Sequence, residues 1–373
     1  MKEKILILFS GYNQRAITAF LRTLEKNKVE YAIIAKSKDD PIFLTKYKNK
    51  VVAIREYIPL ILTDLLTTIN KVKLLFPAEE YVIAPSTEAL NRFLLQNREV
   101  FLKEKCTIPL VNKSMYENIS DKYDFGKKCK EEGILIPNEF KKEEIREFPV
   151  VAKPIKYFST SQQKTLSPII MNSQTEWENF LKDFDFEDFY FQEYIEGKCL
   201  YLLYYFHRDG TIFKFSQENL VQQSGGKSML AAVSSAFHTS AESDKYEKLF
   251  KSLNFYGFLM VEVKQKYNKN YMIEANPRFW GPSQLFVDAG INFFEFFLHD
   301  YGFLNSLPEI KLKEDIVKYF WFGGLMSEMK NRADLTFYNI KENHFFSNLH
   351  DWLTYDVYKR EDTLEIFKRE LMP

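Results

Sequence analysis

Residues 257–263 read GFLMVEV, and residues 273–278 read IEANPR. Both segments are rich in apolar residues and have the length of a β-strand, so together they predict a hairpin. If its loop is centred near Asn268, Glu262 faces Glu274 across the two strands. The sequence therefore predicts two carboxylates within cross-strand contact distance.

The paired carboxylates favour a divalent cation. Like charges placed directly opposite destabilise a sheet, and next to the apolar residues 258–261 two uncompensated carboxylates are costly, whereas a bound cation removes that cost. Side chains alternate along a strand, so Asn276 shares a face with Glu274 and adds an amide oxygen. The oxygen donors Glu262, Glu274 and Asn276 suit Mg²⁺ rather than zinc. The alternative is a solvent-facing strand with ordinary charges.

Arg278 extends this polar row. It lies two residues beyond Asn276, and its planar guanidinium can bind a phosphoryl oxygen pair in a bidentate way. Pro277 has no backbone N–H to donate, so the chain can leave the sheet there. The row therefore ends in a group suited to phosphate.

The first part of the chain predicts an α/β fold. Apolar runs at residues 4–9, 29–35, 51–54 and 81–84 predict strands, with helical patterns after the first and the third. This order is typical of parallel βα units in an open sheet. Gly11 follows the first strand but lacks the G-x-G-x-x-G spacing, so no dinucleotide site is predicted.

The hairpin sequence is similar to the metal-binding strands of ATP-grasp enzymes. It looks most like the carboxylate–amine ligase branch, in which an E-x-N-P-R run follows an upstream acid, and the resemblance extends over residues 4–301. It implies an α/β ATP-grasp fold in parts: a Rossmann-like region at 1–112, a linker helix and small α+β lid at 113–190, an α+β core with the metal site at 191–308, and a C-terminal extension at 309–373 packed on the core. Mg-ATP would lie between the lid and the core.

The resemblance also implies roles outside the hairpin. Lys122, in Ser-Asp-Lys, matches the first nucleotide-contacting lysine of the family, and Lys153, in Val-Ala-Lys-Pro, matches the lysine on the α- and β-phosphates. Gln192, Glu193 and Ile195 match the adenine hinge. Glu193 and the backbone of Ile195 would read the edge of the base.

Two positions depart from the family pattern. Residues 155–164 contain no glycine where the family has a glycine-rich loop over the phosphates, which leaves hydroxyls, backbone amides and Lys164 as donors. Cys199 stands where the family tends to have an acid that contacts the ribose, and Glu196 is the candidate substitute.

The implied reaction has two steps and uses ATP and Mg²⁺, with Mn²⁺ as an alternative metal. A substrate carboxylate attacks the γ-phosphate to give an acyl phosphate and ADP, and an amine then displaces phosphate. Glu262, Glu274 and Asn276 would hold the metal, Arg278 would stabilise the transferring group, and residues 280–283 would border the acceptor. Two other functions stay open: a non-catalytic or regulatory nucleotide-binding protein, and a carboxylase that uses bicarbonate.

Composition bears on the class of partner and on the cellular compartment. The 51 basic and 51 acidic residues cancel, so no basic surplus indicates a nucleic-acid partner. Small-molecule carboxylate and amine substrates are what the family resemblance implies. The three cysteines, Cys106, Cys129 and Cys199, are widely spaced, which is typical of a reducing compartment. No signal peptide or membrane span is predicted, so we expect a cytoplasmic protein, and a homodimer stays open.

Residues 225–228 read GGKS and resemble part of a phosphate-binding loop. The first glycine of a Walker A motif would fall on Val221, so that motif is excluded. We expect a flexible loop near the substrate, and a plain surface loop is the alternative.

Overall fold

The computed structural model describes residues 2–159 and 164–372, and its first sheet confirms the parallel βα units. The strand order is β3-β2-β1-β4-β5, with every neighbouring pair parallel. The strands are β1 (Lys2–Phe9), β2 (Tyr31–Ala35), β3 (Val51–Ile54), β4 (Ala78–Ile83) and β5 (Cys106–Thr107). Leu6 and Leu8 pack in the hydrophobic cluster of α1 (Gln14–Lys26), whereas Ile5 and Ile7 pack in that of α2 (Leu62–Leu75). Burial of both faces explains the unbroken apolar run.

The second sheet lies in the region predicted to be the lid, a name kept below for this region, and carries Lys153. It has the order β10-β7-β11-β6 and is antiparallel. Its strands are β6 (Glu139–Phe140), β7 (Val150–Pro154), β10 (Ile169–Met171) and β11 (Phe189–Glu193), and a separate pair is β8 (Phe158–Ser159) with β9 (Lys164–Thr165). Trp177 and Phe180 of α7 (Gln174–Asp183) belong to a hydrophobic cluster made only of lid residues. Residues 160–163 of the glycine-free loop lie outside the described residues.

The central sheet is antiparallel and contains the predicted hairpin. Its order is β16-β15-β12-β13-β14-β17, and β18 pairs with β13. The strands are β12 (Lys198–Phe206), β13 (Ile212–Gln222), β14 (Met229–Ser235), β15 (Gly257–Lys266), β16 (Lys269–Asn276), β17 (Lys318–Phe320) and β18 (Thr336–Phe337). Tyr267 and Asn268 join β15 to β16 with φ of 48° and 59°, as a two-residue type I′ turn requires. Residues 309–373 thus supply two strands to this sheet.

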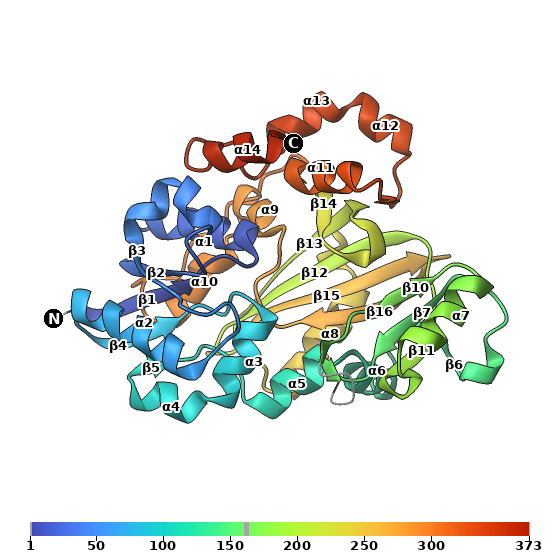
Figure 1. The fold of residues 1–373 in the computed structure, drawn as a ribbon, viewed down its shortest axis with the longest axis horizontal. Helices are drawn as coiled ribbons and strands as arrows, with labels where there is room; N and C mark the ends of the chain where they lie inside the picture. Colours follow the sequence, from blue (N-terminus) through green and yellow to red (C-terminus); the bar gives the residue numbers. More distant parts are fainter. Residues whose placement is uncertain (1, 160–163, 373) are drawn as a thin grey trace.

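Helices surround the sheets. Those not yet named are α3 (Glu88–Gln96), α4 (Arg98–Lys103), α5 (Lys113–Ser120), α6 (Lys122–Glu131), α8 (Ala241–Ser252), α9 (Ser283–Asp288), α10 (Phe293–Asp300), α11 (Phe322–Lys330), α12 (Glu342–Ser347), α13 (Leu349–Trp352) and α14 (Leu364–Leu371). Figure 1 shows the N-terminal sheet at one end of the central sheet, the lid with α7 at the other, and α11–α14 along one side. Within residues 2–159 and 164–372, no helix is long and apolar enough to cross a membrane.

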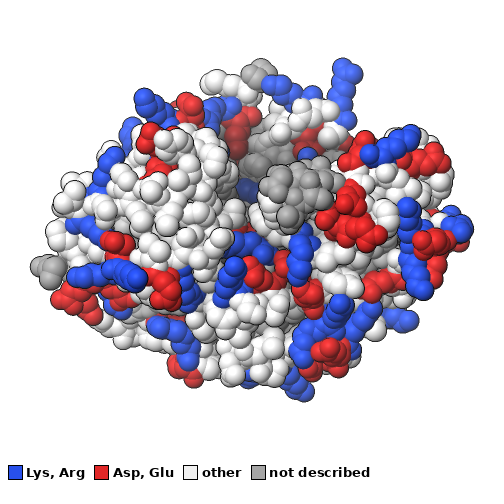
Figure 2. All heavy atoms as spheres, turned by 60° about the horizontal axis from the view of Figure 1, so that its bottom comes forward, with Lys and Arg blue, Asp and Glu red and all other residues white. Residues whose placement is uncertain are grey.

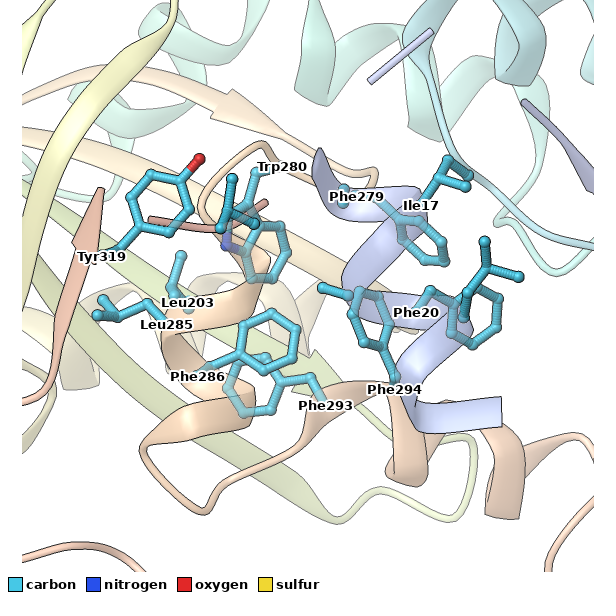
Figure 3. Close-up of a cluster of buried hydrophobic side chains, with 14 of the residues drawn as sticks. Ile17, Phe20, Leu203, Phe279, Trp280, Leu285, Phe286, Phe293, Phe294 and Tyr319 are labelled. Carbon is cyan, nitrogen blue, oxygen red and sulfur yellow. The ribbon is translucent and has the colours of Figure 1, made fainter. Parts of the chain in front are cut away.

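Four packed aromatic rings connect α1 to the central sheet. Figure 3 shows Phe20, Phe279 and Phe294, and the fourth ring is that of Phe258 on β15. The ring of Phe279 lies 5.1 Å from that of Phe20 and 4.9 Å from that of Phe258, both edge to face. Phe20 also packs 4.9 Å from Phe294 of α10. Because Phe279 directly follows Arg278, this packing fixes the start of the segment that leaves the hairpin.

Candidate active site

A cavity of about 770 Å³ lies between the lid, the central sheet, the first turn of α1 and the C-terminal helix α14. Figure 2 shows a hollow in the middle of one face, with Lys and Arg atoms in and around it. Of the described residues, seven basic side chains (Arg15, Lys122, Lys153, Lys227, Lys264, Arg278, Arg369) and four acidic ones (Glu193, Glu262, Glu274, Glu370) line the cavity. The whole chain has equal numbers of basic and acidic residues, whereas basic groups are in excess at the cavity. This local excess favours an anionic ligand.

The hairpin brings the predicted polar row together on the cavity wall. Glu262 pairs directly with Glu274 in the strand register, as the sequence predicts, and the register shifts just after Glu262. Asn276 Nδ2 donates to Glu274 Oε1 at 2.6 Å, and Arg278 Nη2 donates to Asn276 Oδ1 at 3.2 Å. The row is therefore connected by hydrogen bonds from Glu274 to Arg278.

The two carboxylates have different surroundings. Burial alone would raise the pKa of Glu274, but the ammonium of Lys122, which forms an ion pair with it, and the amide of Asn276 bring that pKa to about 2. Burial raises the pKa of Glu262, with Lys264 opposing the shift and the charge of Glu274 adding to it. Among the described residues no ion pair reaches Glu262. The ionised form of Glu262 therefore lacks a direct ion pair such as Glu274 forms with Lys122.

Lys153 is a buried cation on β7 of the lid. Its side chain is 5% exposed, and its ammonium donates to the carbonyl of Ile273 on β16 at 3.0 Å. Burial, with repulsion from Lys122, lowers the pKa of Lys153 to about 8. An anion placed beside it would favour the charged form.

Arg278 is the last residue of the polar row, and the hydrogen bonds that hold its guanidinium are long. Its Nε is 3.5 Å from Glu88 Oε2, and its Nη1 donates to the carbonyl of Phe279 at 3.2 Å. About a quarter of its side chain (28%) is exposed. The guanidinium thus keeps room to bind a ligand oxygen.

The predicted hinge is only partly on the cavity wall. Glu193 and Ile195 line the cavity, and Glu193 Oε2 accepts from Asn138 Nδ2 at 2.8 Å. Gln192 is buried inside the lid, and its side chain is not among those lining the cavity. Glu196 is exposed and borders a separate groove beside the turn at residues 267–268. The structure therefore does not bring the side chains of Gln192 and Glu196 to the other predicted residues.

Cys199 is not among the residues that line the cavity, and it lies beside Glu262. It is fully buried, accepts from Asn219 Nδ2 at 3.2 Å, and its thiol lies 3.6 Å from Glu262 Oε1. Cys106, Cys129 and Cys199 are all buried free thiols. Burial raises the pKa of Cys199 to about 12, so it is a neutral neighbour of Glu262.

Lys264 was not predicted to be in the site. It lies two residues beyond Glu262, is 6% exposed, and its ammonium has no hydrogen-bond partner among the described residues. The ammonium lies 3.5 Å from the ring centre of Tyr338, which belongs to the C-terminal extension. A lysine two residues beyond Glu262, on the same face of the strand, was a visible signal in the sequence, whereas its partner Tyr338 was not.

Further unpredicted residues come from α1 and from the C-terminal extension. Arg15 lies on the first turn of α1, and Trp321 and Glu370 come from the extension. The predicted flexible loop at residues 225–228 and the predicted border at residues 280–283 lie beside them, and both contribute to the lining. The sequence predicted a helix after the first strand. No motif indicated that this helix or the C-terminal extension would contribute to the site.

The donor set fits Mg²⁺ bound together with phosphate. Within residues 2–159 and 164–372, no group of three or more His, Cys, Asp and Glu side chains is arranged to hold a metal ion. Two carboxylates and one amide are instead available, and Mg²⁺ is commonly held by one or two carboxylates plus substrate phosphates. Lys122, Lys153 and Arg278 are basic side chains that line the same cavity.

Solved structures share this architecture at low sequence identity. The biotin carboxylase domain of 2-oxoglutarate carboxylase from Hydrogenobacter thermophilus, solved with MgADP, ADP and bicarbonate, has a TM-score of 0.63 and 16% identity over 86% of this chain and 74% of that one. N5-carboxyaminoimidazole synthetase from Staphylococcus aureus has a TM-score of 0.62 and 16% identity over 89% of this chain and 86% of that one.

L-amino acid ligase from Bacillus licheniformis has a TM-score of 0.55 and 14% identity, over 79% of this chain and 73% of that one. No protein-family model matches the sequence, and no curated protein matches it. The likeness to these structures confirms the α/β ATP-grasp fold that the resemblance of the hairpin sequence implied.

Proposed function

We propose that this chain is an ADP-forming, ATP-dependent ligase that activates a substrate carboxylate and joins it to an amine. The observation that carries the proposal is the carboxylate pair Glu262–Glu274, in register and in one cavity with Lys122, Lys153 and Arg278. Such a site combines metal ligands with separate cations for phosphate oxygens. That combination suits phosphoryl transfer, which depends on alignment and charge neutralisation rather than on a nucleophilic side chain.

Mg²⁺ would be held by Glu262, Glu274 and Asn276, and it would neutralise charge on the phosphate oxygens. Lys122 forms an ion pair with Glu274. With a metal on Glu274, the ammonium of Lys122 would become available to a phosphate. Lys153 would regain its full positive charge beside the phosphates, because an adjacent anion raises the pKa of an ammonium.

The proposed reaction has two steps. A carboxylate oxygen of the substrate attacks the γ-phosphorus, the bond to the β–γ bridging oxygen breaks, and ADP leaves. An amine nitrogen then attacks the acyl carbon, phosphate leaves, and the amine loses a proton. Arg278 would stabilise the charge that spreads over the transferring group, since its guanidinium offers two parallel donors. Glu193 and the backbone of Ile195 would bind the base edge of the nucleotide.

ADP release tests the proposal. The chain would be incubated with Mg-ATP and amino acids, singly and in pairs, and with bicarbonate in a separate arm, with hydroxylamine added to trap an acyl phosphate. Release that needs a carboxylate and an amine, and that Glu274→Gln abolishes, supports the ligase. Release that needs bicarbonate would mark a carboxylase. Nucleotide binding without release under any mixture would mark a regulatory nucleotide-binding protein and reject the ligase.

A further inference from the structure

The cavity has a second polar region, beside α1, that offers mainly donors. Trp280 is 2% exposed and lines the cavity, and its Nε1–H finds no acceptor among the described residues. The side-chain nitrogen of Gln14 likewise has no acceptor among them. Both residues adjoin the first turn of α1, a helix of 13 residues whose first amides carry partial positive charge.

Arg15 provides a buried, fixed guanidinium in the same region. It is 9% exposed and donates to the carbonyl of Met229 at 2.9 Å, to the hydroxyl of Tyr319 at 3.2 Å and to Ser228 Oγ at 2.9 Å. Its carbon centre also lies 3.9 Å from the ring centre of Trp321. Every one of these partners is uncharged, and among the described residues no carboxylate forms an ion pair with Arg15.

Glu370 is the acidic residue nearest this region, and among the described residues it forms no ion pair with Arg15. Its Oε1 accepts from Trp321 Nε1 at 3.1 Å, and the guanidinium of Arg15 lies over the ring of the same indole. Burial raises the pKa of Glu370 to about 7, although Trp321 and Arg15 oppose the shift. A buried cation and two buried donors without acceptors are costly to keep unless a ligand completes them.

We propose that Gln14, Arg15, Lys227, Ser228 and Trp280, here called the Arg15 pocket, bind an anionic group of the substrate, a carboxylate or a phosphate. That the ligand is a substrate rests on the proposed ligase function. The bound group is the end that does not react. The substrate class is therefore an amine or carboxylate with a second, anionic group, such as an α-amino acid or a phosphorylated amine.

The position of the pocket supports this assignment. A Cβ atom on Gly281 would lie 2.8 Å from Arg15 Nη2, so glycine at this position lets the guanidinium lie directly against the chain. Gly281 is three residues beyond Arg278. An anion on Arg15 would therefore hold the rest of a small substrate next to the group proposed to act on the phosphoryl centre.

The indole N–H of Trp280 gives a direct test by NMR. Trp280→Phe assigns its signal among the four tryptophans, and sodium acetate and inorganic phosphate are then titrated at constant ionic strength, with and without saturating Mg-ADP. We expect each anion to shift this signal saturably, while the signal of Trp352, outside the cavity, stays in place. Arg15→Met should weaken anion binding roughly tenfold or more, as loss of a charged hydrogen-bonding group does.

Lys227→Met keeps the test valid if Arg15→Met does not fold, because Lys227 is exposed. It should weaken anion binding roughly threefold, whereas the exposed Lys248→Met should not. A stronger response to acetate assigns a carboxylate to the pocket, and a stronger response to phosphate assigns a phosphate ester. Three results would overturn the proposal. They are no saturable shift with either anion, an anion affinity that stays at the wild-type value in both Arg15→Met and Lys227→Met, and binding of Mg-ADP itself in the Arg15 pocket. Failure of Mg-ADP to bind would count against the ligase alone, because the acetate titration without nucleotide still reports on the pocket.

Discussion

The two polar regions of the cavity handle charge in different ways. At the hairpin, Glu274 has the ammonium of Lys122 and the amide of Asn276 as partners. In the Arg15 pocket the guanidinium has only neutral partners, and the N–H of Trp280 has no acceptor among the described residues. At the hairpin, Glu274 is therefore held in an ion pair with Lys122, whereas in the Arg15 pocket the guanidinium is held by hydrogen bonds to uncharged groups and the N–H of Trp280 is held by packing.

This difference has an energetic consequence. A ligand at the hairpin must replace existing protein contacts, so part of its interaction energy is offset by those it breaks. A ligand in the Arg15 pocket meets donors that are already desolvated and oriented, which reduces the cost of binding. The following variants test each side of this comparison.

Glu274→Gln should have the largest effect, on the compensated side. It removes a carboxylate from the proposed metal site and deprives Lys122 of its ion pair, so turnover should fall roughly a hundredfold or more. ADP release measures the effect, circular dichroism checks the fold, and the exposed Glu365→Gln is the matched control. Near-normal turnover in a folded Glu274→Gln protein would show that the carboxylate pair holds no catalytic metal.

Arg278→Lys should have the next largest effect. Lysine keeps the charge but cannot offer two parallel donors, so turnover should fall roughly tenfold to a hundredfold. Nucleotide affinity, measured by titration, should change only a few-fold, because the guanidinium acts mainly when charge redistributes. Collapsed affinity with surviving turnover at saturating ATP would instead make Arg278 a ground-state anchor.

Lys153→Met should remove the cost of burying the Lys153 ammonium against the hairpin. The folded-state pKa of about 8 lies below the ordinary lysine value, so the unfolded chain holds more protons between about pH 8 and 10.4. The unfolding free energy of the wild type should therefore rise with pH across that window and be lowered below it. At pH 7 the ligand-free variant should be more stable by about 2 kcal/mol.

Denaturant titrations at pH 7 and pH 9.5 measure this difference, and the gap between the two proteins should shrink at the higher pH. Mg-ATP should raise the melting temperature of the wild type more than that of the variant. Equal thermal shifts in the two proteins would remove Lys153 from the nucleotide site.

Glu370→Gln should have the smallest effect, on the uncompensated side. The folded-state pKa of about 7 lies above the ordinary value for Glu, so the wild type loses stability as the pH rises from about 4.3 through 7. Glutamine is neutral and can still accept from Trp321, and the group is partly exposed. The variant should therefore be more stable by about 1 kcal/mol at pH 8 and unchanged below pH 4. Equal stability at pH 8 in denaturant titrations would contradict the account of Glu370.

The sequence predicted the hairpin side far better than the Arg15 side, for a physical reason. Strand alternation and a two-residue turn determine the register, so the pairing of Glu262 with Glu274 follows from local sequence. Lys122 and Lys153 could be placed only through the family resemblance, because they reach the hairpin from other elements. The roles of all these residues remain predictions.

The Arg15 pocket could not be predicted because its parts meet only through tertiary packing. Arg15 bonds to Tyr319, 304 positions away, and stacks on Trp321 from the C-terminal extension. Nothing in the composition of residues 309–373 indicated that they would join the central sheet and reach the cavity. Likewise, the backbone turn after Ile195 carries Glu196 away from the cavity, which sequence spacing does not show.

The separate hydrophobic cluster of the lid has a consequence for hydrogen exchange. The two larger clusters each combine residues of the N-terminal and central sheets, such as Leu6 with Leu203 and Ile5 with Leu202. Amides of β1 and β12 should therefore become exchangeable together, in the global opening of the molecule. Lid amides can exchange through a smaller, local opening, because their cluster is built from lid residues alone. The wall that carries Lys153 would then open and close many times within the lifetime of the folded hairpin it faces.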